Sequence, residues 1–200
     1  MTSFIEGCFY INLDRRPDRR AEVEEEFKKM DLVVERFSAI DRKPGIVGCG
    51  LSHLAVLKMA RERGLKNVLI FEDDFQFIIT KAEFETLLND FFTSSVAYDV
   101  VMLAYSLEEK IEYNDMLYKV IGASTASAYI VHERFYDKLI DLYEKSFPQL
   151  ISTGMHWIYA NDQVWKVLQP QSNWFAFCKR VGKQRRSYSD LSLMVKDYGF

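Results

Sequence analysis

Short apolar runs alternate with polar or amphipathic segments along the first half of the chain. Runs rich in aromatic and β-branched residues predict strands at 8–13, 32–37 and 67–71. Between them, a charged segment that begins at Pro17 and a more apolar segment at 51–63, closed by a glycine, predict two helices. This order of strand, helix, strand, helix and strand is typical of a parallel sheet with helices on its faces. We therefore expect an α/β fold.

The second half of the chain continues less regularly. Its pattern predicts, in order, a helix at 81–91, a strand at 98–103, a polar connection at 108–115, strands at 116–121 and 126–131, and helices at 133–145 and 162–168. The sequence has no internal repeat, no low-complexity tract and no linker. We therefore expect residues 1–200 to form a single domain.

Composition and charge exclude several classes of protein. The 200 residues are 48% hydrophobic and 28% charged, which excludes a disordered, collagen-like or coiled-coil chain. The net charge of −3 argues against a nucleic-acid coat and against a membrane-surface binder. No segment approaches the roughly 20 apolar residues of a transmembrane helix. The first residues also lack the basic start of a signal peptide.

The cysteines indicate the redox compartment. Cys8, Cys49 and Cys178 are odd in number, far apart and without the spacing of metal ligands. They are expected to be free thiols in a reducing environment, which favours a cytoplasmic location. A catalytic domain trimmed from a longer protein would have the same features.

An acidic triplet follows the third predicted strand. Glu72, Asp73 and Asp74 stand at its carboxyl end, the edge of an open α/β sheet at which ligands bind. An extended backbone would point Glu72 and Asp74 to one side and Asp73 to the other. Because clustered carboxylates repel, a hard divalent cation is a natural companion for them. The alternative is a helix cap or a solvated loop.

Glycines precede the second predicted helix. Gly45, Gly48 and Gly50 leave backbone N–H groups exposed before it, and such groups favour an anion. The segment is not a dinucleotide fingerprint, because His53 stands where the third glycine would be, and it lacks the Lys-Ser/Thr of a P-loop. As alternatives, Ser52 could cap the helix and His53 could be a hydrogen-bonded core residue, and for His53 this second interpretation is favoured.

Several motifs in the same order resemble glycosyltransferase family 25, which includes bacterial lipooligosaccharide galactosyltransferases and procollagen galactosyltransferases. They are INLDRRPDR at 11–19, FSAID at 37–41, GCGLSH at 48–53 and VLIFEDD at 68–74. Further on, the strands predicted at 98–103 and 126–131, Pro170 and QRRSYSD at 184–190 resemble later parts of the family pattern. The resemblance spans nearly the whole chain.

The resemblance implies a single GT-A-type domain with a Rossmann-like N-terminal half and a mostly parallel central sheet. Residues 1–104 would bind the nucleotide sugar, and residues 105–200 would bind the acceptor and supply a closing C-terminal segment. The implied sugar donor is UDP-galactose or UDP-glucose, the implied metal is Mn²⁺ or Mg²⁺, and the implied transfer inverts the anomeric carbon. The acceptor would be a carbohydrate or a hydroxylysine-containing chain, and no nucleic-acid partner is expected.

The resemblance also implies roles for individual residues. Asp74 resembles the metal-binding acid of a DxD-type motif, with Glu72 as a second metal ligand. Asp41 is followed by Arg42, where the family more often has glycine, so the loop departs from the pattern there. The implied sugar-donor site consists of Asn12, Leu13 and Arg19 in the nucleotide pocket, Ala39 and Asp41 beside the base, Gly48 and Ser52, Glu72 and Asp73 at the ribose and sugar, and Gln184 and Ser189 over the diphosphate.

Inverting transfer needs a base, and Asp162 is our candidate because the family carries an aspartate in a similar context. The alternatives for Asp162 are a helix N-terminus and a residue that orients the acceptor. Whether His53 or His156 contacts the metal is left open. The basic run at 179–186 could contact the diphosphate, an acidic acceptor or membrane surface, or only solvent.

Two classes of function remain open at this point. The favoured one is a metal-dependent hexosyltransferase. The alternative is a catalytically silent family member that binds a glycan or a protein, because a fold can keep its pocket and lose its chemistry. Trp157, Tyr159, Trp165 and Trp174 could form an acceptor platform, although most aromatic residues are simply core.

Overall fold

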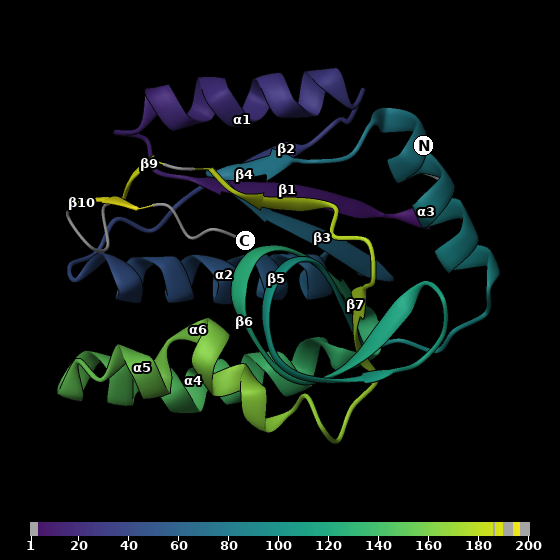
Figure 1. Cartoon of the computed structure of the whole chain (residues 1–200). Coiled ribbons are helices and arrows are strands. Elements are labelled where there is room, and N and C mark those ends of the chain that lie inside the picture. Colours follow the sequence, from purple (N-terminus) through teal and green to yellow (C-terminus); the bar gives the residue numbers. More distant parts are fainter. Residues whose placement is uncertain (1–3, 186, 190–193, 197–200) are drawn as a thin grey trace.

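A computed structural model describes residues 4–185, 187–189 and 194–196, with side chains described for 4–185. Its centre is a six-stranded sheet in the order β2-β1-β3-β6-β5-β7 (Figure 1). Within this sheet β6 runs against the other strands, so the sheet is mostly parallel, as predicted. The strands are β1 (Gly7–Asn12), β2 (Glu35–Ser38), β3 (Asn67–Glu72), β5 (Val100–Glu112), β6 (Leu117–His132) and β7 (Trp174–Phe177).

Helices cover both faces of the sheet and bury two hydrophobic clusters. In β3, Val68 and Ile70 point to one face, while Leu69 and Phe71 point to the other, as strand geometry requires. The first face packs on α2 (Gly45–Glu62) and α4 (Tyr136–Thr153), and the second on α1 (Pro17–Lys29) and α3 (Lys81–Thr93). Apolar runs in the central strands follow from this burial on both sides.

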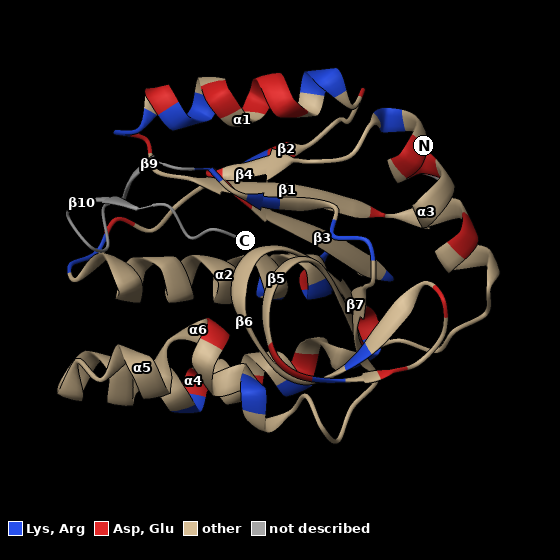
Figure 2. Ribbon diagram, in the orientation of Figure 1, with Lys and Arg blue, Asp and Glu red and all other residues tan. Residues whose placement is uncertain are grey.

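The two helices next to β1 differ in their surroundings. Helix α1 carries a dense mixture of acidic and basic residues and lies on the outside, whereas most of α2 is uncharged (Figure 2). Helix α2 is sandwiched between the sheet and α4, so a large part of it is buried. The charged α1 and the apolar α2 therefore follow from their different exposure to water.

Smaller elements complete the fold. Strand β4 (Phe75–Phe77) pairs with β8 (Gly182–Gln184), which brings the C-terminal region back to the end of β3. The remaining elements are η2 (Glu133–Phe135), α5 (His156–Tyr159), α6 (Asn161–Val164), η3 (Trp165–Val167), β9 (Ser187–Ser189) and β10 (Met194–Lys196).

One prediction about the glycines was wrong. Helix α2 begins at Gly45 instead of Leu51, so Gly48 and Gly50 lie inside the helix. The reason is close packing: a Cβ on Gly48 would overlap the carbonyl oxygen of Ile40, and one on Gly50 would lie 2.8 Å from the ring of Phe147. These glycines allow neighbouring segments to approach a helix and do not form a loop.

Some boundaries in the second half were also wrong. The predicted polar connection at 108–115 is mostly the outer end of β5, and the two strands predicted at 116–121 and 126–131 are one long strand, β6. The outer end of this hairpin is exposed and polar, so its sequence lacks the alternation of apolar and polar residues that marks a half-buried strand. The pairing of β5 with β6 stabilises it as a strand nevertheless. The helix predicted at 133–145 begins later and continues to Thr153.

Candidate functional site

A pocket of about 120 Å³ lies at the carboxyl ends of β1 and β3, which are adjacent and parallel. This is the edge at which open α/β sheets bind ligands. Its walls come from the end of β1, the connection between β2 and α2, the first turns of α2, the end of β3 and Gln184 after the β4–β8 pairing. The lining residues are Ile11, Leu13, Arg15, Arg19, Ala39, Ile40, Asp41, Arg42, Gly45, Gly48, Cys49, Glu72, Asp73, Asp74 and Gln184.

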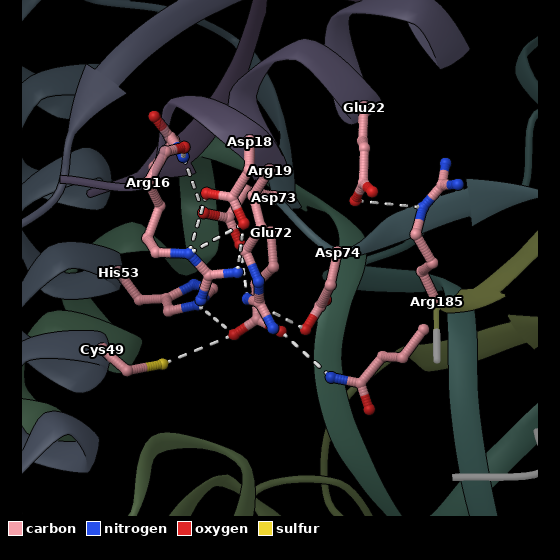
Figure 3. A network of polar contacts seen from close by, with 12 residues as sticks. Arg16, Asp18, Arg19, Glu22, Cys49, His53, Glu72, Asp73, Asp74 and Arg185 are labelled. Carbon is pink, nitrogen blue, oxygen red and sulfur yellow. Dashed lines mark hydrogen bonds and ion pairs between the residues drawn. The ribbon is translucent and has the colours of Figure 1, made fainter. Parts of the chain in front are cut away.

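The acidic triplet ends β3 and forms the floor of this pocket. Glu72 is the last residue of the strand, and Asp73 and Asp74 form the turn into β4. Asp73 accepts a hydrogen bond from Asn12 Nδ2 at 2.8 Å and pairs with Arg19 at 2.8 Å. The same Arg19 nitrogen lies 3.4 Å from Asp74 (Figure 3). The chain thus places one guanidinium against two of the three clustered acids.

The two carboxylate oxygens of Glu72 contact different residues. Oε1 lies 3.2 Å from Nε2 of His53 and accepts a hydrogen bond from Cys49 Sγ at 3.4 Å, whereas Oε2 accepts one from Gln184 Nε2 at 3.4 Å (Figure 3). Behind it, Nδ1 of the fully buried His53 lies 2.8 Å from the hydroxyl of Tyr129. His53 therefore has a partner on each ring nitrogen, as the core interpretation predicted, and one of those partners belongs to the pocket.

The electrostatic states of Glu72 and Asp74 differ although both side chains are largely shielded from solvent. Burial alone would raise the pKa of Glu72, but hydrogen bonding and charge from His53, with further help from Cys49 and Arg19, hold that pKa below its ordinary value. For Asp74, burial and the charge of Glu72 raise the pKa to about 7, in spite of the nearby Arg19. Within this pocket, Asp74 is therefore the carboxylate that gains most from an added cation.

The residues present fit a hard divalent ion. Oδ1 of Asp74 is buried and has no hydrogen-bond partner among the described residues, and the carboxylate of Glu72 lies beside it. Carboxylate oxygens are the ligands that Mn²⁺ and Mg²⁺ prefer. Such an ion would satisfy the unpartnered oxygen and lower the pKa of Asp74.

Most of the predicted sugar-donor residues come together here. The structure places in the pocket wall Leu13, Arg19, Ala39, Asp41, Gly48, Glu72, Asp73, Asp74 and Gln184. Asn12 is buried beneath them and holds Asp73. Ser52 is also buried: its hydroxyl donates to the Gly48 carbonyl at 2.7 Å and accepts from the Ile40 N–H at 2.8 Å, so it fixes the loop that lines the pocket. Ser189 lies in β9, whose side chains are outside the described residues.

Asp162 lies in the first turn of α6, but it does not cap this helix. Its Oδ2 instead accepts a hydrogen bond of 3.1 Å from the backbone N–H of Thr125 in β6. Burial raises the pKa of Asp162, and the negative charge of Glu72 raises it further, which places the two carboxylates within electrostatic reach of each other. The predicted base is thus a partly buried carboxylate within electrostatic reach of the pocket residue Glu72.

The aromatic residues divide into core and surface. Trp165 and Trp174 are fully buried and belong to the core, which was the default expectation. Trp157 is 61% exposed on α5, next to the exposed His156. Among the described residues, the side chains that gather as a potential metal-binding group are Cys49, His53 and Glu72, and His156 is not one of them.

Cys49 was missed as a site residue. All three cysteines are free thiols, as predicted, but Cys49 lines the pocket and contacts Glu72. A helix prediction that began at Gly45 would have found it, because Cys49 and His53 are four residues apart and so share one helix face. No comparable helix spacing or motif indicated that Arg15 and Arg42 would line the pocket or that Tyr129 would contact His53.

Comparison with known proteins identifies the family. A profile described as "Glycosyltransferase family 25 (LPS biosynthesis protein)" matches residues 44–156, more than half of the chain. The chain belongs to glycosyltransferase family 25.

Curated relatives carry the same family name. A Drosophila pseudoobscura protein named "Glycosyltransferase 25 family member" is 33% identical over 101 residues, covering 36% of this chain and 16% of that protein. A human protein named "Inactive glycosyltransferase 25 family member 3" is 30% identical over 124 residues, covering 48% of this chain and 21% of that protein. The chain thus spans about a sixth to a fifth of the length of these relatives.

Solved structures share the fold at low sequence identity. The protein A197 from STIV gives a TM-score of 0.51 at 13% identity, covering 96% of this chain and 98% of that one. A glycosyltransferase involved in glycosylation of the major capsid of PBCV-1 gives a TM-score of 0.51 at 9% identity, covering 84% and 81%. The architecture is the GT-A-like mixed α/β fold expected from the sequence. In the part of the chain that the structure describes, no helix has the length and apolar character needed to cross a bilayer.

Proposed function

We propose that this family 25 protein transfers a hexose, galactose foremost, from a UDP-sugar to a hydroxyl group of a glycan or hydroxylysine-type acceptor, with inversion. The observation that supports this proposal is the convergence of four motif segments on one pocket whose floor is the cluster Glu72, Asp73 and Asp74. A pocket at this sheet edge suits a nucleotide sugar, and the acids suit the metal that accompanies it.

The pocket residues suggest how the sugar donor lies. Leu13 and Ala39 offer apolar surface for the nucleoside, and Asp41, held by Arg15 at 2.9 Å, offers a carboxylate beside it. The N-terminal turn of α2 and Arg19 would face the diphosphate, since backbone N–H groups and a guanidinium both attract phosphate. Asp74 and Glu72 would hold Mn²⁺ or Mg²⁺. When bound, the ion neutralises the charge that develops on the departing diphosphate.

Asp162 would perform the proton transfer. As the acceptor oxygen forms its bond to the anomeric carbon and the bond to the diphosphate breaks, the acceptor hydroxyl loses its proton to the Asp162 carboxylate. A partly buried carboxylate with a raised pKa is a stronger base than a fully exposed one. The hydrogen bond from the Thr125 N–H holds one of its oxygens in place.

The alternative is a catalytically silent member that binds a glycan or a protein. The ion pairs of Arg19 with Asp73 and Asp74 favour it, because a guanidinium can balance the acids without a metal. Human and mouse relatives are named inactive, so this family includes proteins described in that way.

Calorimetric titration of UDP-galactose and UDP-glucose, with and without Mn²⁺, tests the proposal. We expect metal-dependent binding of one sugar nucleotide that is lost in Asp74→Asn and kept in Asp90→Asn, an exposed aspartate of α3. A folded protein that binds neither nucleotide would overturn the transferase proposal. Binding without transfer to any acceptor and without slow hydrolysis of the sugar nucleotide would favour the silent alternative.

A further inference from the structure

Cys49 and His53, which have no role in the proposed transfer reaction, form a group of potential metal ligands with Glu72. Their ligand atoms lie within 4.8 Å of one another. The first two come from successive turns of α2, and the third from the end of β3. A thiol, an imidazole and a carboxylate are ligands of borderline-soft ions such as Zn²⁺, whereas Mn²⁺ and Mg²⁺ prefer oxygen alone.

The separations suit a tetrahedral ion. Glu72 Oε1 lies 3.2 Å from His53 Nε2 and 3.4 Å from Cys49 Sγ. With Zn–N and Zn–O bonds of about 2.0 Å and a Zn–S bond of about 2.3 Å, adjacent tetrahedral ligands stand about 3.3–3.5 Å apart. The two separations from Glu72 therefore already match those around such an ion, and the ligand atoms of Cys49 and His53 lie within 4.8 Å of each other.

The surroundings of the histidine also suit a metal site. Metal-bound histidines usually have a hydrogen-bond partner on the second ring nitrogen, which fixes the tautomer and the ring orientation. Here the hydroxyl of Tyr129 lies 2.8 Å from Nδ1 of the buried His53 ring. The other ring nitrogen, Nε2, points toward Glu72. Cys49 and Glu72 line the pocket, which would give an ion a path of entry from the cavity.

We propose that Cys49, His53 and Glu72 bind a thiophilic divalent cation of the Zn²⁺ class, separate from the hard-ion position at Asp74. On binding, the Cys49 thiol releases its proton to solvent and the sulfur coordinates the ion, while His53 coordinates through Nε2. Glu72 contributes Oε1, and its other oxygen remains directed to Gln184. The two cation positions share Glu72, so an ion in one weakens binding in the other. This inference concerns metal binding by the chain itself and does not depend on the proposed function.

Cobalt spectroscopy tests the site on the full chain after removal of metals with a chelator. We expect Co²⁺ to give a thiolate-to-metal charge-transfer band with a stoichiometry of one ion per chain, and we expect Zn²⁺ to abolish this band. Cys49→Ser should lose the band, while the matched variants Cys8→Ser and Cys178→Ser should keep it. Tyr129→Phe should keep the band but weaken Zn²⁺ binding by about 10- to 100-fold, because it removes the partner of Nδ1.

A second measurement needs no variant and so does not depend on correct folding of a mutant. Alkylation of the unmodified protein, followed by mass spectrometry, reports the reactivity of each cysteine. Zn²⁺ should slow alkylation of Cys49 at least tenfold and leave Cys178 unchanged. The absence of a thiolate band in the unmodified protein, a band that survives in Cys49→Ser, or equal alkylation of Cys49 with and without Zn²⁺ would each overturn the proposal. The trio would then be a hydrogen-bonded network that only orients Glu72.

Discussion

At the scale of single residues, two partly buried aspartates of this site have different surroundings. Asp74 faces Glu72 and has an oxygen without a partner among the described residues, so its environment suits a cation. Asp162 instead accepts a backbone hydrogen bond from Thr125 and lies within electrostatic reach of Glu72. The difference in neighbours, and not in residue type, supports a metal ligand in one case and a base in the other.

We predict that Asp162→Asn lowers the rate of transfer by about 10²- to 10⁴-fold, the usual contribution of a general base. Binding of the sugar nucleotide should remain within a few-fold, because this side chain is outside the pocket wall. Steady-state kinetics and calorimetry on the same preparation check both. A variant that loses nucleotide binding, or one that keeps full transfer activity, would contradict the assignment.

We also predict an acidic limb in the rate at saturating sugar nucleotide and metal. The pKa of Asp162 is raised, mainly by burial, so its carboxylate becomes protonated at a higher pH than an ordinary aspartate does. Below that pKa the rate should fall tenfold per pH unit, since only the ionised form accepts a proton. A pH profile of kcat measures this. A rate that stays constant down to the ordinary range of an aspartate, about pH 4, would exclude Asp162 as the base.

At the scale of elements, helix α2 positions one side of the pocket through its glycines. Gly48 lets the segment that contains Ile40 lie directly against the helix, and Gly50 receives the ring of Phe147 from α4. The hydroxyl of Ser52 forms hydrogen bonds with the backbone of both Ile40 and Gly48, which links the two segments. The pocket wall between β2 and α2 is thus held by close backbone contacts.

We predict that Gly48→Ala destabilises the protein by about 1–3 kcal/mol, the usual cost of overpacking, because the added methyl group meets a backbone oxygen that cannot rotate away. The matched variant Gly122→Ala should change stability by less than about 0.5 kcal/mol, since its added carbon would lie 3.6 Å from the nearest atom, an ordinary contact. Urea unfolding of both variants measures the difference. Equal stabilities would show that the close approach at Gly48 relaxes without cost.

At the scale of the whole molecule, the sheet joins the two halves of the chain into one pocket. Strands β1 and β3 supply the floor, and the β4–β8 pairing carries Gln184 from the C-terminal region to Glu72. The division into a nucleotide-sugar half at 1–104 and an acceptor half at 105–200 remains a prediction. Because segments far apart in sequence meet here, a bound ligand should stabilise the fold as a whole.

We predict that Mn²⁺ together with the bound UDP-sugar raises the melting temperature by about 5–10 °C. A free ligand concentration of 100 times its Kd stabilises the folded state by about 2.7 kcal/mol. For a chain of this size, 1 kcal/mol corresponds to about 2–4 °C. Thermal unfolding followed by fluorescence measures the shift. Asp74→Asn should show little shift, and an unchanged melting temperature in the unmodified protein would speak against the site.

The sequence alone was informative where the signal is local. Apolar runs predicted β1 and β3, Pro17 predicted the start of α1, and the acids after β3 predicted where the pocket lies. It failed for α2, where glycines that serve packing looked like a loop, and for the β5–β6 hairpin, whose pairing leaves no alternation in the sequence. Composition and periodicity report burial, but they do not report which segment comes close to which.

The sequence by itself therefore determined the α/β order, the family resemblance and the acidic edge of the sheet, because hydrophobic period and motif spacing act over a few residues. The tertiary structure alone decided the contacts within the site. Asn12 meets Asp73 across 61 positions, His53 meets Tyr129 across 76, and Asp162 meets the Thr125 backbone across 37. Such contacts form only when the sheet and its helices pack together, because the sequence pattern around a residue does not specify a partner so far away in the chain.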